Sequence, residues 1–472
     1  MRSFEMTRVL AALASICLLV SPALAQIRTP PANQVELQLS YAPLVKQVSP
    51  AVVNVYASRV VTTQRRGFPF DDPLFAELFG GQLPSMPRER MQRSLGSGVL
   101  IGQEGIVVTN NHVIAGMTDV RVSLVDQREF DADIVLTDAV SDIAVLKIRD
   151  AKGSFPVVPL ADPDATEVGD IVLAIGNPFG LGQSVSQGIV SAVRRVQKKS
   201  GEQAVYLQTD AAINQGNSGG ALIDMRGELV GINTSIFTKG GGSDGIGFAV
   251  PSSIVKLVVD AARAGEKVVR RPWLGAELQT VTREIADAME LERPTGALVA
   301  DVIAESPAAA AGLKAGDVIT AIDGRAVEDP AALSYQLTIR RIGSTAQLDV
   351  LRDGKIFRVA LKAQAAPETV PRDERVLDGN GPFNGAKVVN LSPAVAEEIG
   401  LEGPPRGVLV LDVERGSVAA RVGLEKGDRV LMLNDVKIES VDDLAKVNAS
   451  GERLWKVTIQ RNGQLATRMF RL

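Results

Sequence analysis

Residues 97–112 read SGVLIGQEGIVVTNNH, and this stretch decides the class of fold. Two apolar runs, 97–101 and 106–109, are separated by the turn residues Gln103, Glu104 and Gly105. This spacing predicts a β-hairpin. The second run leads directly into His112, the only histidine in the chain. A side chain capable of acid–base chemistry is therefore expected just after a strand.

The residues around this hairpin, from about 40 to 250, repeat the same pattern of short apolar runs. Further strands are expected at residues 51–61, 120–124, 143–148 and 171–175, separated by Gly, Asp and Asn. Many short strands with little helical periodicity predict a mainly β domain, a sandwich or a barrel, instead of a parallel α/β sheet. An insertion at residues 62–93 carries four phenylalanines among prolines and glycines. It either packs on another subunit or forms a poorly ordered surface loop.

A helix at residues 252–264, capped by Ser252 and Ser253, is expected to close this domain. Beyond it the chain repeats itself, because SPAAAAGLKAGD at 306–317 matches SVAARVGLEKGD at 417–428, a spacing of 111 residues. Two copies with strand and helix signals predict two small α+β domains and not a solenoid. Residues 363–382, with three prolines and mixed charges, are expected to link them.

Each copy is expected to contain one longer helix. In the first copy, Asp329 and Pro330 would start the helix and Gly343 would end it. In the second copy, Ser440 with Asp443 would form the cap.

Composition excludes several function classes. A chain of 472 residues is too long for one core and fits about three domains. Lys and Arg total 51 against 55 Asp and Glu, so no basic excess exists to bind nucleic acid. With one histidine and one cysteine, Cys17, a Cys/His zinc site is close to excluded, and we expect neither a metal nor another cofactor.

The first 25 residues are typical of an export signal. Arg2 and Arg8 precede the apolar run 9–20, and Ala23 to Ala25 form a small-residue cleavage site. The alternative, an uncleaved anchor, is disfavoured because the run is shorter than the ~20 residues that cross a bilayer. We expect cleavage after Ala25 and export to a bacterial periplasm, with no stable membrane insertion.

Three segments of the first domain carry unusual chemistry. They are TNNHVI at 109–114, SDIAVLK at 141–147 and GNSGG at 216–220. A serine hydroxyl becomes a nucleophile when a base takes its proton, and that base needs a carboxylate to orient it. Each residue alone has an ordinary explanation, but His112, Asp142 and Ser218 together also follow the chain order of chymotrypsin-like enzymes. The glycines let the backbone aim the amides of Gly216 and Ser218 at one oxyanion.

These motifs, with GNPFG at 176–180 and TDAAINQGNSGGAL at 209–222, resemble the HtrA family in its DegP/DegQ branch. The resemblance covers nearly all of the mature chain. It implies a trypsin-like double six-stranded β-barrel followed by two PDZ domains. It also implies hydrolysis of peptide bonds without ATP, in which His112 is the general base, Asp142 orients it and Ser218 is the nucleophile. The oxyanion hole would lie at Gly216, Asn217 and Ser218.

The resemblance further implies what the protein binds and how it assembles. Its partners would be unfolded exported polypeptides and exposed C-terminal peptides, and it would form homotrimers or larger trimer-based assemblies. The implied domains are a signal peptide (1–25), a protease domain (26–265), PDZ domains (270–364 and 381–472) and a linker (365–380). Asn217 replaces the acidic residue with which digestive trypsins pair a new N-terminus, so activation would come from loop ordering.

Other positions in the resemblance concern specificity and regulation. Ala212 and Ile213, with Phe237, would line an apolar pocket that accepts small or medium aliphatic side chains. Arg195 falls in the sensor loop that contacts the activation loop near residues 180–183, where glycines serve either mobility or ordinary turns.

In the first PDZ-like copy, the loop that grips a peptide carboxylate would be formed by Trp273, Leu274, Gly275 and Ala276, and Arg271 could add charge nearby. The matching stretch FNGA at 383–386 is a looser match, so the second copy either captures peptides or serves assembly.

The leading hypothesis is therefore an exported serine endopeptidase of protein quality control, with chaperone activity as an additional expectation. Two alternatives stay open. One is a non-catalytic PDZ holdase or scaffold, and the other is a regulatory protease that cuts one signalling protein.

Overall fold

The computed structural model describes residues 40–63, 88–151, 153–162, 166–177, 182–197, 203–214, 216–236, 245–399, 401, 406–461 and 463–472. The expected signal segment and most of the insertion at 62–93 lie outside these residues. Within them, every helix is too short or too polar to cross a membrane. The first elements are α3 (Ala42–Val48) and a 3-10 turn, Ser49–Ala51.

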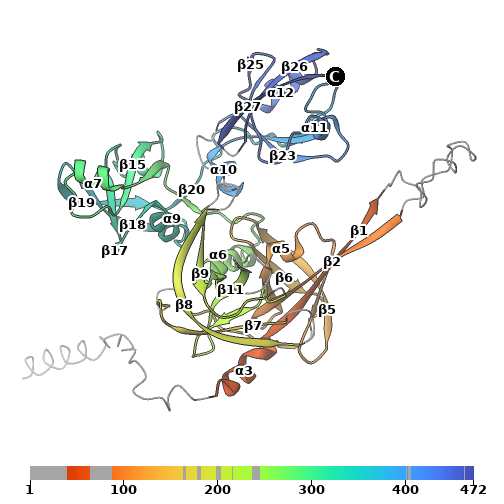
Figure 1. The fold of residues 1–472 in the computed structure, drawn as a ribbon, viewed down its shortest axis with the longest axis vertical. Coiled ribbons are helices and arrows are strands. Elements are labelled where there is room, and N and C mark those ends of the chain that lie inside the picture. Colours follow the sequence, from red (N-terminus) through yellow and green to blue (C-terminus); the bar gives the residue numbers. More distant parts are fainter. Residues whose placement is uncertain are drawn as a thin grey trace, which may run out of the picture. The chain divides into compact units, whose positions relative to one another are not determined.

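The first half of the mainly β region closes into a six-stranded barrel, shown in warm colours in Figure 1. Its strands, in spatial order, are β1 (Val52–Thr63), β2 (Arg88–Gly102), β3 (Ile106–Asn110), β6 (Ile143–Ile148), β5 (Glu129–Asp138) and β4 (Asp119–Ser123). The predicted hairpin is present, because Gly105 N–H donates to Gly102 O and β2 pairs with β3. The strands β1 and β2 pair as far as Thr63 with Arg88, so both strands extend into the expected insertion.

A second six-stranded barrel follows. Its strands, in spatial order, are β10 (Ala221–Ile223), β11 (Leu229–Ile236), β12 (Gly247–Pro251), β9 (Gln203–Thr209), β8 (Ser184–Gln197) and β7 (Ile171–Gly176). Fully buried Val, Leu and Ile side chains such as Val172, Leu222 and Ile213 fill its core. The prediction of a mainly β, double-barrel fold is confirmed.

The helix α6 (Ser252–Arg263) follows β12 as predicted, but its cap differs from the prediction. Pro251 occupies the N-cap position and no side chain caps the helix. Ser252 Oγ instead donates to Ala161 O, 3.4 Å away, because residues 252 and 253 are buried. A serine held against a neighbouring segment cannot turn back to its own helix.

The first copy of the sequence repeat, called repeat 1 (residues 272–365), is built on one antiparallel sheet. The sheet order is β14 (Ala276–Thr280), β15 (Ala297–Val302), β16 (Val318–Ile322), β18 (Thr345–Arg352) and β19 (Lys355–Lys362). The remaining elements are β13 (Pro272–Trp273), α7 (Arg283–Ala288), α8 (Pro307–Ala310), β17 (Arg325–Ala326), α9 (Pro330–Thr338) and β20 (Gln364–Ala365).

The second copy, called repeat 2 (residues 375–471), has the same order of elements up to its last long strand, but its first short strand pairs with the main sheet, whereas β13 of repeat 1 pairs with β20. The sheet order is β21 (Arg375–Val376), β22 (Ala386–Asn390), β23 (Val408–Val413), β24 (Arg429–Leu433), β26 (Leu454–Arg461) and β27 (Gln464–Arg471). The remaining elements are α10 (Pro393–Ile399), α11 (Val418–Arg421), β25 (Val436–Lys437) and α12 (Val441–Asn448). The expected linker, 365–380, thus contains a strand that belongs to this sheet.

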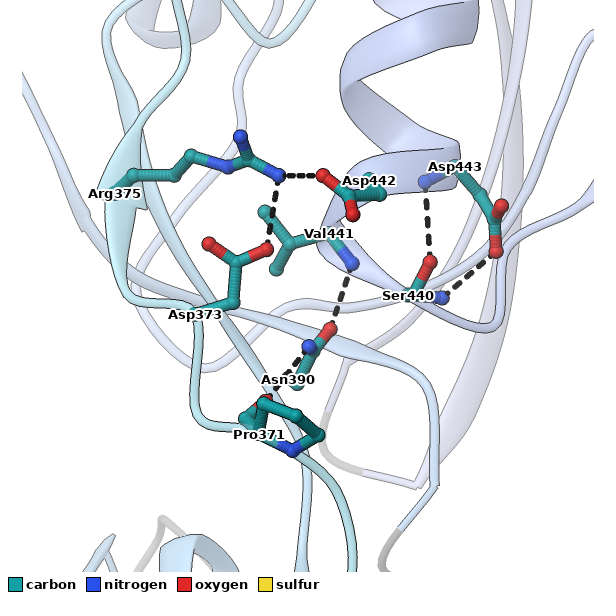
Figure 2. Close-up of polar contacts among 8 residues, drawn as sticks. All are labelled: Pro371, Asp373, Arg375, Asn390, Ser440, Val441, Asp442 and Asp443. Atoms are coloured by element: carbon teal, nitrogen blue, oxygen red, sulfur yellow. Dashed lines mark hydrogen bonds and ion pairs between the residues drawn. The ribbon is translucent and has the colours of Figure 1, made fainter.

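The predicted helix starts in both repeats are confirmed. Asp329 caps α9 by accepting from Ala332 N–H at 2.7 Å, and Ser440 with Asp443 forms a capping box on α12. Figure 2 shows the Ser440 and Asp443 contacts. The helix α9 ends at Thr338, before Gly343, because residues 339–343 already turn toward β18.

Candidate functional site

The three predicted catalytic side chains come from turns in both barrels. His112 lies in α5 (Asn111–Ile114), directly after β3, and Asp142 lies in the turn between β5 and β6. Ser218 lies in the turn before β10 in the second barrel. Segments more than 100 residues apart in sequence therefore meet at one site.

His112 and Asp142 are in direct contact. Their ring Nδ1 and carboxylate Oδ2 are 2.7 Å apart, and His112 backbone N–H donates to Asp142 Oδ1 at 2.9 Å. The Asp142 backbone has a φ of +59°, a left-handed conformation that few non-glycine residues adopt. Its carbonyl accepts hydrogen bonds from Asn111 N–H and Asn110 Nδ2, both at 3.0 Å. The turn is thus fixed at its backbone and at its side chain.

Burial and hydrogen bonding act in opposite directions on the Asp142 carboxyl. Burial alone would raise the pKa of Asp142. The pKa nevertheless lies below its usual value, because the carboxylate accepts hydrogen bonds from the His112 ring, the Thr234 hydroxyl and the His112 N–H, and because the His112 charge also lowers it. The carboxylate is 16% exposed, while the His112 side chain is 51% exposed. An ionised carboxylate therefore anchors an imidazole that solvent and substrate can reach.

Ser218 joins this pair through Thr234, a residue that the sequence analysis missed. Ser218 Oγ donates to Thr234 O at 2.7 Å, and Thr234 Oγ1 donates to Asp142 Oδ2 at 2.7 Å. Among the described residues, no hydrogen bond joins Ser218 Oγ to His112. Thr234 lies in β11, a strand that was not among those predicted from the sequence, so no sequence signal pointed to this residue.

The turn carrying Ser218 is held against the first barrel by Ser97. Ser97 N–H donates to Ser218 O at 2.8 Å, and its hydroxyl donates to Gly216 O at 2.7 Å. Gly219 has a φ of +84°, and a Cβ there would lie 2.0 Å from Ser97 O. Only glycine permits this close approach of the two barrels.

Two of the three residues expected at the oxyanion hole have free amides. Within the described chain, neither Gly216 N–H nor Ser218 N–H donates a hydrogen bond. The N–H of Asn217 donates to Asn214 O at 3.0 Å, so this amide is already used. The Asn217 side chain is buried, and its Oδ1 accepts from Ser184 Oγ at 3.4 Å.

Two of the three residues expected to line the pocket lie within the described chain, and they differ in burial. Ala212 is exposed, whereas Ile213 is 1% exposed and packs in the core of the second barrel. Phe237 lies outside the described residues. Arg195 lies in β8, paired with Val205, but its side chain and residues 178–181 also lie outside them.

Repeat 1 presents its predicted carboxylate-binding loop in an open state. Gly275 has a φ of +73°, and neither Leu274 nor Gly275 donates its N–H to any described residue. The strand β14 begins at Ala276 and lies at the edge of the sheet, because only β15 pairs with it. Trp273, the first residue of this loop, is half-buried. Free amides and a free strand edge are the features with which PDZ-like folds bind a peptide terminus.

Arg271, expected to add charge to that loop, does something else. Its side chain is 5% exposed and its guanidinium donates to Asp138 in the first barrel. The expectation was wrong because a buried guanidinium needs a carboxylate partner, and Asp138, itself 6% exposed, supplies it.

The matching loop of repeat 2 is filled by its own chain. Gly385 N–H donates to Leu377 O at 2.8 Å, and Leu377 N–H donates to Ala386 O at 2.9 Å. Phe383 N–H donates to the Oδ1 of Asn448, a fully buried side chain, at 2.9 Å. The strand β21 lies antiparallel along β22, the strand that corresponds to β14.

No group of three or more His, Cys, Asp or Glu side chains suited to a metal ion occurs in the part of the chain that the structure describes.

Comparison with known proteins adds an independent line of evidence. Residues 96–232 match the trypsin-like peptidase domain family, and residues 272–363 and 409–461 each match a PDZ domain family. The chain is 39% identical over 479 residues to the periplasmic serine endoprotease DegP of Escherichia coli (strain K12), covering 96% of this chain and 97% of that protein.

Two further relatives give the same result. A probable periplasmic serine endoprotease DegP-like of Rhizobium meliloti (strain 1021) is 37% identical over 474 residues, covering 92% of this chain and 91% of that one. The solved structure of the HtrA-type protease AlgW with a decapeptide superposes with a TM-score of 0.52 and 41% identity, covering 70% of this chain and 99% of that chain.

Proposed function

Because the chain belongs to the HtrA family of DegP-type serine endoproteases, we propose that Ser218, His112 and Asp142 carry out its peptide-bond hydrolysis. The chain is a serine-type endopeptidase with two PDZ domains, and its DegP relatives place it in the periplasm. The observation that supports the assignment is the hydrogen-bonded route from Ser218 through Thr234 to Asp142 and His112.

The proposed reaction begins with a small movement of the Ser218 hydroxyl. Rotation about its Cα–Cβ bond takes Oγ from Thr234 O toward the free Nε2 of His112, which accepts the proton as Oγ attacks the substrate carbonyl. Asp142 keeps the other ring proton on Nδ1 and stabilises the imidazolium that forms. His112 then returns the proton to the leaving amine, and water releases the acyl group by the same steps.

The oxyanion of the tetrahedral intermediate needs hydrogen-bond donors that the resting chain does not use. The N–H groups of Gly216 and Ser218 meet this requirement, since both lie in the catalytic turn and both are unpaired within the described chain. Removing one such donor costs about 100-fold or more in kcat. Asn217 contributes through its buried side chain to the shape of the turn and not through its N–H.

The proposed substrate class rests on the residue type at position 212. Ala212 stands where a trypsin-like pocket selective for Lys or Arg would carry an acid, so no charge is available there to pair a cation. We therefore expect cleavage after Val, Ala or Ile, residues that are buried in folded proteins and exposed in unfolded ones. A peptide series that differs only in the residue before the cleaved bond would measure this preference.

Repeat 1 would capture exposed C-terminal peptides, and repeat 2 would not. The loop Trp273 to Ala276 offers free amides beside the open edge of β14. In repeat 2, β21 takes the equivalent edge, and Leu377 O and Asn448 Oδ1 accept from the loop amides in place of a carboxylate. Leu377 is 3% exposed in the core of this repeat, as the terminal side chain of a peptide would be.

Other features are inferred from family membership. The homotrimer or larger assembly, the chaperone activity, the cleavage after Ala25 and the division into residues 26–265, 270–364, 365–380 and 381–472 remain predictions. Sedimentation of the mature protein would measure the assembly, and N-terminal sequencing of exported protein would locate the cleavage.

Digestion of unfolded casein tests the proposed reaction. We expect Ser218→Ala to abolish turnover, with a loss on the order of 1,000-fold or more, while Ser344→Ala in repeat 1 keeps wild-type activity. No turnover by wild type or by Ser218→Ala would support a non-catalytic holdase instead, and equal turnover by both would show that Ser218 is not the nucleophile. Cleavage confined to one folded protein, with casein left intact, would support a regulatory protease.

A further inference from the structure

We propose that Arg271 is a positioning residue for the catalytic Asp142, acting through Asp138 and Ser141. The inference rests on the proposed function of the triad. It concerns a buried guanidinium that lies far from Asp142 in sequence and directly before the first strand of repeat 1.

The turn that presents Asp142 is closed by one carboxylate. Asp138 ends β5 and pairs with Ile143 of β6, so residues 139–142 form the connection between the two strands. The Oδ2 of Asp138 accepts hydrogen bonds from the backbone N–H of Ser141, at 3.2 Å, and from the Ser141 hydroxyl. The residue before Asp142 is therefore tied to the residue at the end of β5.

Arg271 completes this arrangement at the same oxygen. Its guanidinium donates to Asp138 Oδ2, and the two side chains are 5% and 6% exposed. An ionised carboxylate with so little solvent is costly unless a cation pairs with it. Glu397 of α10 interacts electrostatically with the same pair. Burial raises the pKa of Glu397, the charge of Arg271 lowers it, and the charge of Asp138 raises it further. Arg271 is thus the cation that lets Asp138 hold the turn.

Asp142 depends on this support because its backbone takes a left-handed φ of +59° at the end of a tight turn. Aspartate adopts this conformation more readily than most residues, and contacts on both sides of the turn hold it in place. Two contacts on the His112 side do so, from Asn110 and Asn111 to Asp142 O. The Asp138–Ser141 contacts enforce it from the other end of the turn. If they loosen, the carboxylate moves relative to Nδ1 of His112, and misplacement by ~1 Å can cost on the order of 100-fold in rate.

Arg271 of the Arg271–Asp138 pair also lies close in sequence to the proposed peptide-binding loop. Arg271 is two residues before Trp273, where the proposed peptide-binding loop of repeat 1 begins. The same short segment therefore leads into that loop and pairs with Asp138, the residue from which the turn carrying Asp142 starts.

The test uses the full mature chain and three measurements: kcat and KM on a short fluorogenic peptide, the NMR resonance of the His112 Nδ1 proton, and thermal unfolding. His112 is the only histidine, so its ring proton is assigned without ambiguity. For Arg271→Met we expect kcat to fall on the order of 100-fold with KM within about twofold, and the Nδ1 proton to shift or broaden. Arg271→Lys, which keeps the charge, is expected to restore part of kcat.

Arg352→Met is the matched control. Arg352 pairs with the buried carboxylate of Asp317 in repeat 1, at 2.5 and 2.7 Å, but touches no catalytic turn. It is expected to lower the thermal midpoint while kcat and the Nδ1 proton stay at wild-type values. The proposal is overturned if Arg271→Met behaves in the same way as this control.

A second variant covers the case in which Arg271→Met does not fold. Arg271→Met combined with Asp138→Asn removes both charges of the pair at once, so neither is left without the other in the protein interior. We expect the double variant to fold and to lose no more kcat than the worse single variant, since both changes break one linkage. Wild-type kcat and an unchanged Nδ1 proton in the double variant would overturn the proposal. Full turnover by Ser218→Ala would instead overturn the proposed function, and it would leave the NMR result unaffected.

Discussion

The two repeats share a fold and a loop, but they differ in what pairs with the outer edge of β14 in repeat 1 and of its counterpart β22 in repeat 2. Gly275 and Gly385 both have left-handed φ, and a Cβ on either would meet the Cβ of an equivalent serine, Ser306 at 2.2 Å or Ser417 at 2.3 Å. In repeat 1 the edge of β14 is unpaired, whereas in repeat 2 β21 pairs with β22. The features that the two repeats share therefore determine the loop, and the segment that precedes β22 in repeat 2 determines whether a ligand can enter.

In repeat 2, the segment that precedes β22 is anchored at several points, as Figure 2 shows. Asn390 donates to Pro371 O at 2.8 Å and accepts from the first N–H of α12, that of Val441, at 2.6 Å. Arg375 forms ion pairs with Asp373, at 2.8 Å, and with Asp442 of the same helix. The chain before β22 is thus fastened to β22 and to the N-terminus of α12. This difference between the repeats leads to three predictions.

The largest expected effect is on peptide affinity. Gly275→Ala adds a Cβ to the open loop at a left-handed φ and should weaken binding of a free C-terminal peptide on the order of 100-fold. Gly385→Ala introduces nearly the same clash in repeat 2 and should leave affinity unchanged. Fluorescence anisotropy with a labelled peptide, and the same peptide amidated at its C-terminus, measures both. Equal loss in the two variants would mean that repeat 2 also binds peptide.

A smaller effect is expected from loosening β21. Leu377→Ala removes a buried side chain and should cost about 3 kcal/mol in the unfolding free energy of repeat 2, measured by urea titration. A second peptide site should then be detectable by calorimetry. Leu361→Ala, a comparably buried leucine in repeat 1, is the control and should create no new site. If Leu377→Ala binds the same number of peptides per chain as wild type, then β21 does not cover a peptide site at the edge of β22.

The smallest effect concerns the helix caps. The Ser440 hydroxyl hydrogen bond, opposed by partial burial, holds the pKa of Asp443 below its usual value, whereas the equivalent position of α9 is Ala332. Because the pKa of Asp443 is lower in the folded chain than the unfolded value of about 3.9, the ionised carboxylate stabilises the helix above that pH. This contribution is lost as the pH falls through the folded pKa. Asp443→Asn should cost about 1 kcal/mol at pH 7 and less below pH 3, measured by thermal unfolding across pH. A cost that does not change with pH would contradict the cap assignment.

Local chemistry made much of this structure predictable. The hairpin at 97–112 and the α12 cap depend on neighbouring residues, so their sequence signals sufficed. The double barrel and the PDZ domains came from resemblance, because short strands alone leave a sandwich and a barrel open.

Features that depend on distant segments were not predictable. Thr234 matters only because β11 brings it between Ser218 and Asp142, which no spacing in the chain indicates. Arg271 was assigned to the wrong partner because its burial against Asp138 is a property of the folded chain. The residues 375–377 looked like a linker because a two-residue edge strand has almost no pattern of its own.

The central claim is that Ser218 is a nucleophile activated by His112 and Asp142, and covalent labelling tests it most directly. A phosphonofluoridate probe should add one adduct per active chain, mapped to Ser218 by mass spectrometry, with hydrolysis lost in proportion. His112→Ala and Asp142→Asn should slow labelling by orders of magnitude while the chain stays folded. Labelling at wild-type rate in His112→Ala, or full hydrolysis by a chain whose Ser218 is modified, would contradict the account.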